Sequence, residues 1–160
     1  ERVIRKLMEC LHTENVSSAS RLDNETNNYD TAGKNVQEQF VKYLRTKFND
    51  DLDAMNQAFG LDYWSNRINA WEDFRIVRGT INGSLGAEFQ KFQRTLVDDY
   101  LQWQADIVKE YAREDQFITH NFDFDWRGYS YGVQPMVDQK HAARALTVAG
   151  VDIYHRHRTN

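Results

Sequence analysis

Hydrophobic residues recur at intervals of three and four in several parts of the chain, which is the spacing of helices that bury one face. The longest such pattern starts after Ser84, a residue type suited to the N-cap position, and continues to about Arg113. Its apolar members are Leu85, Phe89, Phe92, Leu96, Tyr100, Trp103, Ile107 and Tyr111. Shorter patterns predict helices at about residues 3–11, 31–48 and 52–59, so the chain is expected to be dominated by helices.

Polar residues and glycine mark the expected ends of the shorter helices. Asp30 is a candidate N-cap for the helix at 31–48, because its carboxylate can accept a free backbone N–H. Asn49 or Asp50 could cap the helix at 52–59. Gly60 suits the left-handed position that often ends a helix, so we expect that helix to stop there.

Short apolar runs in the last third of the chain predict strands. Residues 117–122 and 151–155 are the two such runs, and a helix rich in small residues is expected between them at 141–148. Helices that alternate with short apolar strands are typical of βα units with a parallel sheet. Residues 15–25, by contrast, are mostly polar and carry little strand or helix signal.

Composition narrows the class of protein. The 160 residues suit one compact soluble domain, and they are too few for a complete (β/α)₈ barrel of roughly 200–250 residues. A net charge of -4 without a basic cluster argues against nucleic-acid binding and against a membrane-surface role. No apolar run is long enough to cross a membrane, so we expect a cytoplasmic protein.

Cys10 is the only cysteine, which excludes a disulfide framework and a thiolate metal cluster within the chain. It falls on the apolar side of the first helical pattern, so we expect it to be buried and inert. We predict no metal site and no cofactor.

Four motifs follow one another along the chain: Leu22-Asp-Asn-Glu-Thr26, Phe59–Phe74, Thr119–Phe122 and Val151–His155. Together they resemble glycoside hydrolase family 42, a family of β-galactosidases. The first resembles the Asn-Glu end of one barrel strand of this family. The stretch Phe59–Phe74 is similar to its Trp-rich loop, and Thr119–Phe122 resembles the end of its next strand. Val151–His155 resembles the strand after that. The resemblance covers nearly the whole chain.

The resemblance implies an α/β fold: a helix-dominated segment of a TIM barrel with about three parallel strands at most. Residues 1–160 would form a single domain that corresponds to the fourth-to-sixth strand region of the barrel. It also implies that Glu25 is the general acid/base and that Asn24 binds the sugar 2-hydroxyl. Asn121, Trp64 and Trp71 would help to line the site or its rim. The two tryptophans could equally fasten their loop to the long helix, because both uses favour large flat side chains.

A retaining glycosidase needs two carboxyl groups about 5–5.5 Å apart, one as acid/base and one as nucleophile. In the family the nucleophile lies on the seventh strand, so we expect it to be missing here and the chain alone to be inactive. A β-galactoside would then bind only to an assembled site. The expected partners are the missing barrel strands or a second copy of the chain.

Two stretches depart from the family. Val16–Arg21 is polar where a barrel strand buried on both faces should be apolar, and Arg156–Asn160 follows the last motif in place of the family's proline. These departures support an alternative reading, an engineered or repurposed non-catalytic scaffold or interaction protein. If residues 16–22 form no strand, Glu25 is not held in place, so strand pairing there discriminates between the two hypotheses.

Overall fold

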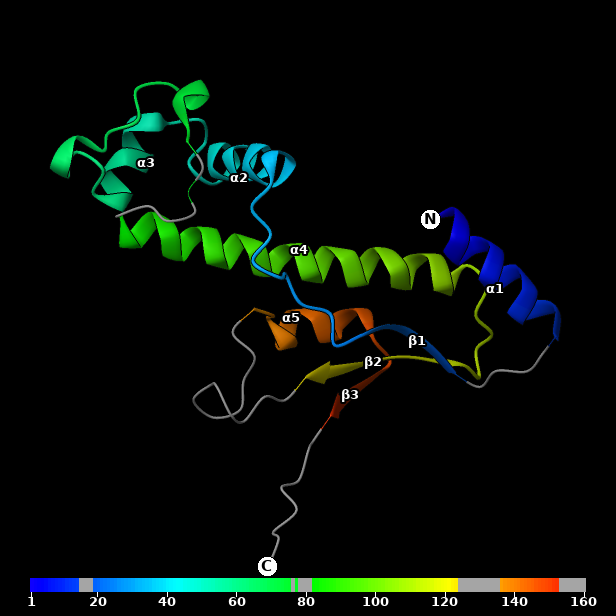
Figure 1. The fold of residues 1–160 in the computed structure, drawn as a ribbon. Helices are drawn as coiled ribbons and strands as arrows, with labels where there is room; N and C mark the ends of the chain where they lie inside the picture. Colours follow the sequence, from blue (N-terminus) through cyan, green and yellow to red (C-terminus); the bar gives the residue numbers. More distant parts are fainter. Residues whose placement is uncertain (15–18, 76, 78–81, 124–135, 153–160) are drawn as a thin grey trace, which may run out of the picture. The chain divides into compact units, whose positions relative to one another are not determined.

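A computed structural model describes residues 1–14, 19–75, 77, 82–123 and 136–152 (Figure 1). Two compact units can be distinguished. One consists of residues 1–28 and 94–160, and the other of residues 29–93. The expectation that residues 1–160 form a single domain stays a prediction.

The first unit is built on a parallel sheet. Its strands are β1 (Ala19–Asn24), β2 (Phe117–Asp123) and β3 (Val148–Asp152), in the order β1-β2-β3. The accompanying helices are α1 (Arg2–Glu14), the second half of α4 (Gly83–Lys109), α5 (Gln139–Ala142) and a 3₁₀ turn at Ala143–Ala145. The α/β class and the parallel strands are therefore confirmed.

One apolar cluster fills this unit. Ile118 and Phe122 alternate with half-buried residues along β2, which is the period-two pattern of a strand with one face on the core. Leu101, Ala105 and Val108 of α4 belong to the same cluster. Its other buried members are Met8, Val97, Val137, Ala142 and Ala145.

The polar segment before Glu25 forms a strand, which the family resemblance implied although the residue pattern itself gave little strand signal. Ala19, Ser20 and Arg21 pair in parallel with Phe117, Ile118 and Thr119, and the register shifts before Asn24 meets Asn121. Main-chain hydrogen bonds to β2 do not depend on apolar side chains, and no residue of β1 is fully buried. Leu22 alone packs on the core cluster. Residues 15–18 lie outside the described part.

The third strand and the helix before it also differ from expectation. The strand begins at Val148 and not at Val151, and residues 153–155 of the expected strand lie outside the described part. The helix expected at 141–148 is short. It begins as α5 at Gln139, where the Asp138 side chain caps it by accepting the His141 N–H at 3.1 Å. The 3₁₀ turn that follows ends at Ala145.

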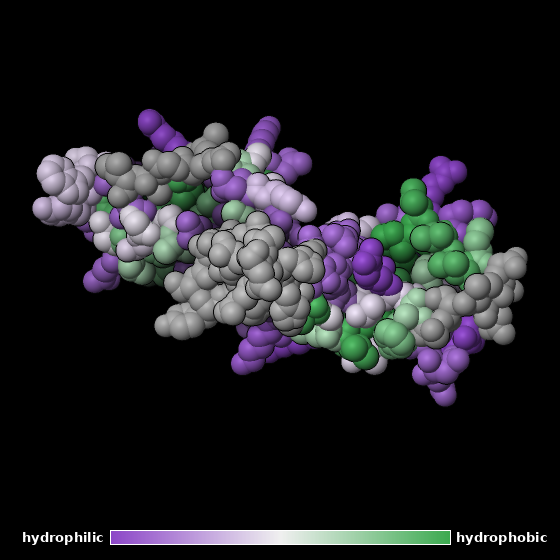
Figure 2. Space-filling view, turned by 60° about the horizontal axis from the view of Figure 1, so that its bottom comes forward, coloured by the Kyte–Doolittle hydropathy of each residue, from purple (hydrophilic) through white to green (hydrophobic). Residues whose placement is uncertain are grey.

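Helix α1 exposes Cys10, so the expectation that it is buried was wrong. Positions 4, 8 and 11 form one helical stripe, and Ile4, Met8 and Leu11 face the core cluster. Cys10 shares the adjacent stripe with Val3 and Leu7, which are 79% and 57% exposed. The apolar pattern of this helix is wider than the surface it buries. Figure 2 shows hydrophobic patches among hydrophilic ones on the face in view.

The second unit contains α2 (Lys34–Lys47), α3 (Leu52–Phe59), the 3₁₀ turns Tyr63–Ser65 and Trp71–Asp73, and the first turns of α4. An aromatic cluster joins α2 to α4. The Phe40 ring meets Phe89 edge to face with centroids 5.0 Å apart, and it meets Phe92 at 5.3 Å. The other buried apolar side chains here are Leu44, Met55, Phe59, Leu61, Val77 and Leu85.

Two of the expected N-caps in this unit were wrong. The helix α2 begins at Lys34, so its N-cap is Gly33. Asp30 lies three residues before that cap and has left-handed backbone, with φ 53°. The N-cap of α3 is Asp51, whose carboxylate accepts the Ala54 N–H at 2.9 Å. The candidates Asn49 and Asp50 also have positive φ, 51° and 62°.

The long helix is capped two residues earlier than expected. Asn82 Oδ1 accepts the Leu85 N–H at 2.8 Å, so this side chain, and not Ser84, satisfies a free donor at the start of α4. At the end of α3, Gly60 takes the expected left-handed conformation with φ 64°. None of the helices in the described ranges is both long and apolar enough to cross a membrane.

Candidate active site

The carboxyl ends of the three parallel strands bring together polar side chains. Asn24 ends β1, Asn121 lies near the end of β2, and Asp152 ends β3. Asn121 Nδ2 donates to Asn24 Oδ1 at 3.0 Å and to Asp152 Oδ2 at 2.5 Å. One amide therefore links the ends of all three strands, at the edge where α/β enzymes place their chemistry.

Glu25 follows directly after β1 and is held to the same edge. Its N–H donates to the Asn121 carbonyl at 3.2 Å, which extends the main-chain pairing beyond the strand. Its backbone is left-handed, with φ 48°. A non-glycine residue in this conformation costs roughly 1–2 kcal/mol, so the surrounding hydrogen bonds must over-determine the position.

Thr26 supplies two of those bonds. Its N–H donates to His120 Nε2 at 3.4 Å, and its hydroxyl donates to Asp23 Oδ2 at 2.6 Å. Thr26 is buried, and His120 has no exposed surface. Thr26, which directly follows Glu25, is thus held by one side chain of β2 and one of β1.

Burial lowers the pKa of His120, and the nearby negative charge of Asp23 offsets this only in part. The neutral ring is therefore the favoured form, as its role of acceptor at Nε2 requires. The proton then sits on Nδ1, which finds no hydrogen-bond partner among the described residues.

Of the predicted site residues, the structure brings Asn24, Glu25 and Asn121 together. Trp64 and Trp71 belong to the second unit. Trp64 is 77% exposed on left-handed backbone, with its ring edge to face with Tyr63. Trp71 is half-buried; it stacks on Phe74 with centroids 6.0 Å apart, and the Arg45 guanidinium lies 5.8 Å from its ring. Their roles toward a substrate stay predictions.

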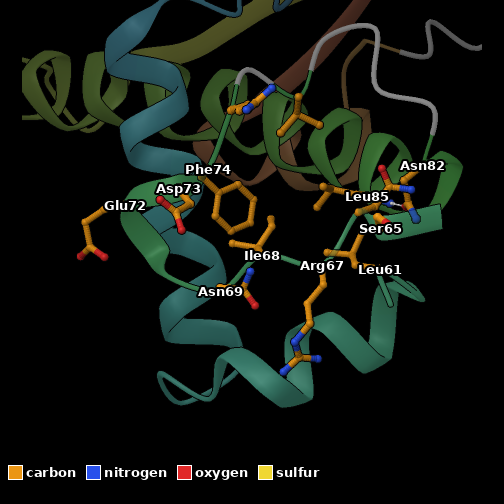
Figure 3. A pocket seen from close by; sticks show the side chains of 13 residues that line it. Leu61, Ser65, Arg67, Ile68, Asn69, Glu72, Asp73, Phe74, Asn82 and Leu85 are labelled. Atoms are coloured by element: carbon orange, nitrogen blue, oxygen red, sulfur yellow. Dashed lines mark hydrogen bonds between the residues drawn. The ribbon is translucent and has the colours of Figure 1, made fainter. Parts of the chain in front are cut away.

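The second unit also holds a pocket of about 710 Å³ (Figure 3). Ile68 and Phe74 form its apolar wall, with Leu85 of α4 and the preceding Asn82 also lining it. Arg67 pairs with Asp53 of α3 and with Asp62, which lies after that helix. Neither Trp64 nor Trp71 is among the residues that line this pocket.

Sequence reasoning missed Asp152, His120 and Thr26 as parts of the site. No signal in the sequence pointed to Asp152, because the expected strand at 151–155 placed it near the start of the strand, whereas β3 ends there. His120 gave no such signal, since its role depends on which face of β2 it occupies. In the described residues, no group of three or more His, Cys, Asp or Glu side chains is arranged to hold a metal ion.

A carboxyl group beside an amide at the carboxyl end of a β-strand can donate or accept a proton next to a bound hydroxyl. Comparison with solved structures places this edge in a larger fold. A GH42 β-galactosidase from G. stearothermophilus matches with a TM-score of 0.86 and 22% identity, over 99% of this chain and 23% of that one. The β-galactosidase from the psychrophilic Marinomonas ef1 matches with 0.80 and 21%, over 96% and 23%.

A third match is the polyextremophilic β-galactosidase from the Antarctic haloarchaeon Halorubrum lacusprofundi, with a TM-score of 0.81 and 21% identity, over 96% of this chain and 22% of that one. At these identities the likeness establishes the fold, a segment of a TIM barrel, as expected. The chain spans about a quarter of the length of these structures. The sequence model of the family described as β-galactosidase matches residues 1–160, and the chain therefore belongs to glycoside hydrolase family 42.

Proposed function

We propose that this chain carries the acid/base half of a retaining β-galactosidase site, with Glu25 as the proton donor to the departing oxygen. The observation that carries the proposal is the fixed position of Glu25 at the end of β1, where its N–H binds the Asn121 carbonyl. General acid–base catalysis needs a carboxyl group held within hydrogen-bond reach of the reacting oxygen. Asn24, next in the chain and bonded to Asn121, would hold the sugar 2-hydroxyl.

Turnover in this proposal requires a second carboxylate from a further segment. The sheet order β1-β2-β3 leaves an outer edge on β1 and on β3 without a partner strand in the described part. Val148 and Val151 of β3 are 51% and 49% exposed, which is unusual for a strand of a parallel sheet. Further barrel strands beside these edges, or less directly a second copy of the chain, would complete the site.

Trp64 is the better candidate of the two tryptophans for a place on the substrate rim. Its ring is largely exposed on strained backbone, and such strain is commonly retained at binding sites. The packing of Trp71 between Phe74 and Arg45 supports a role in fastening the loop to α2.

The alternative function, a non-catalytic scaffold, rested on the polar stretch before Glu25. The pairing of Ala19–Asn24 with β2 weakens that argument, because the strand that positions Glu25 is present. The departure at Arg156–Asn160 lies outside the described residues, so it stays as support for this hypothesis, and the structure adds the exposed apolar stripe of α1.

A nitrophenyl β-galactoside assay tests the proposal on two proteins. One is the chain alone. The other is a chimera in which the chain replaces the matching quarter of the G. stearothermophilus β-galactosidase. We expect no turnover by the chain alone and Glu25-dependent turnover by the chimera, with Glu25→Gln as the matched variant. A chimera that folds but is equally active with Glu25→Gln would overturn the proposal, and a folded, inactive chimera would favour the scaffold.

A further inference from the structure

The side-chain amide of Asn121 lies where its hydrogen bonds can fix the orientation of the Asn24 amide. Its side-chain hydrogen bonds to Asp152 and Asn24 both use the same atom, Nδ2, which carries two hydrogens. One hydrogen is directed to Asp152 Oδ2 (2.5 Å) and the other to Asn24 Oδ1 (3.0 Å). The relay therefore runs from β3 through β2 to β1.

An asparagine amide can usually turn over, because its oxygen and nitrogen have nearly the same size and shape. An ionised carboxylate removes that freedom, since it accepts hydrogen bonds and cannot donate. Asp152 thus requires the nitrogen of Asn121 on its side. The second hydrogen of that nitrogen then requires an oxygen from Asn24, which turns the Asn24 amide so that its own nitrogen remains available.

A further observation indicates that Asp152 controls this choice. Asn121 Oδ1 is buried and has no hydrogen-bond partner in the described part of the chain. A buried acceptor without a donor is unfavourable, so the surroundings of Oδ1 do not explain the orientation. The two hydrogen bonds donated by Nδ2 explain the orientation of the Asn121 amide. The bond to the charged Asp152 carboxylate is the stronger of the two, because its acceptor is ionised.

We propose that Asp152 is a positioning residue that, through Asn121, makes the exposed Asn24 amide a hydrogen-bond donor. The proposal deepens the proposed function and rests on it for the identity of the ligand. A donor at this place recognises an acceptor oxygen, such as a sugar hydroxyl, and its nitrogen carries two hydrogens for this purpose. Asp152 itself does not touch the substrate in this account.

The test compares Asp152→Asn with Asp123→Asn. Asparagine at 152 keeps the shape but can donate, so the relay is free to reverse. The control makes the same chemical change at the end of β2, where Asp123 and Asp152 are paired in the strand register. In the chimera, each variant is assayed with a nitrophenyl β-galactoside and with its 2-deoxy analogue.

In Asp152→Asn the Asn24 amide is no longer held as a donor. The ratio of kcat/KM for the 2-hydroxyl substrate to kcat/KM for its 2-deoxy analogue should therefore fall by about tenfold, because a site built to bind a hydroxyl discriminates against its absence. The control should keep the preference. A structural role alone would lower kcat/KM for both substrates equally, and an unchanged preference in Asp152→Asn would overturn the proposal.

A second measurement does not depend on activity. In the 160-residue chain, the side-chain NH₂ resonances of Asn24 and Asn121 are assigned by ¹⁵N NMR. We expect both to shift in Asp152→Asn and neither in Asp123→Asn. Unchanged resonances would sink the relay, whereas shifted resonances with an inactive chimera would leave the relay standing and count against the proposed function.

Discussion

His120 Nε2 accepts the backbone N–H of Thr26, the residue that directly follows Glu25, at 3.4 Å. The ring is wholly buried in β2 and lies edge to face with Phe122, with centroids 5.0 Å apart. A side chain from the middle strand thus holds the backbone beside the candidate acid/base, although ninety-four positions separate it from Thr26.

Replacing His120 tests this support. His120→Phe keeps a ring but removes the acceptor, whereas His120→Gln offers an oxygen near the place of Nε2. We expect amide hydrogen exchange at Thr26 to become about tenfold faster in the phenylalanine variant, which corresponds to one lost bond of about 1.4 kcal/mol, and to stay close to the original rate in the glutamine variant. Equal exchange in both variants would contradict the role of the acceptor.

The buried His120 imidazole also predicts that the protein loses stability as the pH becomes acidic. The folded pKa of His120 lies below its ordinary value of 6.5, because burial disfavours the charged ring. Its contribution is complete above pH 6.5 and is lost as the pH falls toward the folded pKa, since the unfolded chain then binds more protons. Urea unfolding between pH 7 and pH 5 should show a decrease that is absent in His120→Phe. A decrease of equal size in both proteins would count against this assignment.

Asp98 on α4 predicts the opposite pH dependence, a stability that falls as the pH rises. Burial, and secondly the negative charge of Asp138, raise its pKa to about 6, and its Oδ1 has no partner among the described residues. Stability is therefore lost as the pH rises from about 3.8 to about 6, where the folded protein must give up a proton it favours.

Asp98→Asn should accordingly stabilise the protein at pH 7. A shift of two pKa units corresponds to almost 3 kcal/mol, and partial exposure to solvent reduces the expected gain to about 1 kcal/mol. The gain should disappear near pH 4. Asp99→Asn, at the exposed next position, is the control and should change stability little at either pH. A gain that persists at pH 4 would have another cause than the charge.

Asn56 of α3 predicts a large loss of stability. Its side chain has no exposed surface; Nδ2 donates to the carbonyls of Leu52 and Ile68, and Oδ1 accepts the Ile68 N–H, all at 2.8–2.9 Å. Asn56→Ala leaves buried polar backbone groups unpaired, so we expect a loss of about 3 kcal/mol in chemical unfolding. Asn66→Ala, which removes one surface bond to the Tyr63 carbonyl, should cost less than 1 kcal/mol. Similar losses would show that the loop is not held through Asn56.

The backbone conformation of Glu25 predicts an unusual order of stability for its glycine and alanine variants. At most positions glycine is less stable than alanine, but a left-handed residue reverses this order because glycine has no Cβ to be strained. With φ 48° at position 25, Glu25→Gly should be more stable than Glu25→Ala by about 1 kcal/mol. Thermal unfolding of the two variants measures the difference, and the ordinary order would contradict the left-handed backbone.

How far the sequence predicts this structure depends on the source of each element's stability. The helices with a strong apolar face, such as α4, were predicted, because their period records what they bury. The strand β1 could be expected only from the family resemblance, because it is held by main-chain bonds to β2 and its side chains are mostly polar. Cys10 was misplaced because α1 carries two apolar stripes and only one is covered.

The candidate site divides in the same way. Asn24, Glu25 and Asn121 were proposed from motifs, and the parallel register brings them together. Asp152 and His120 depend on which strand lies beside which, and on the face that each residue of β2 takes. Sequence alone does not carry that information.

The central claim is that Glu25 acts as the acid/base of a retaining site, and azide rescue of the Glu25→Ala chimera tests it most directly. Removing the acid/base slows the second step, in which it activates water, and a small anion that needs no activation can take the place of that water. We predict that azide restores turnover of a dinitrophenyl β-galactoside and that the product is β-galactosyl azide, with retained configuration. Failure of azide to accelerate the folded variant, or formation of the α-azide, would contradict the claim.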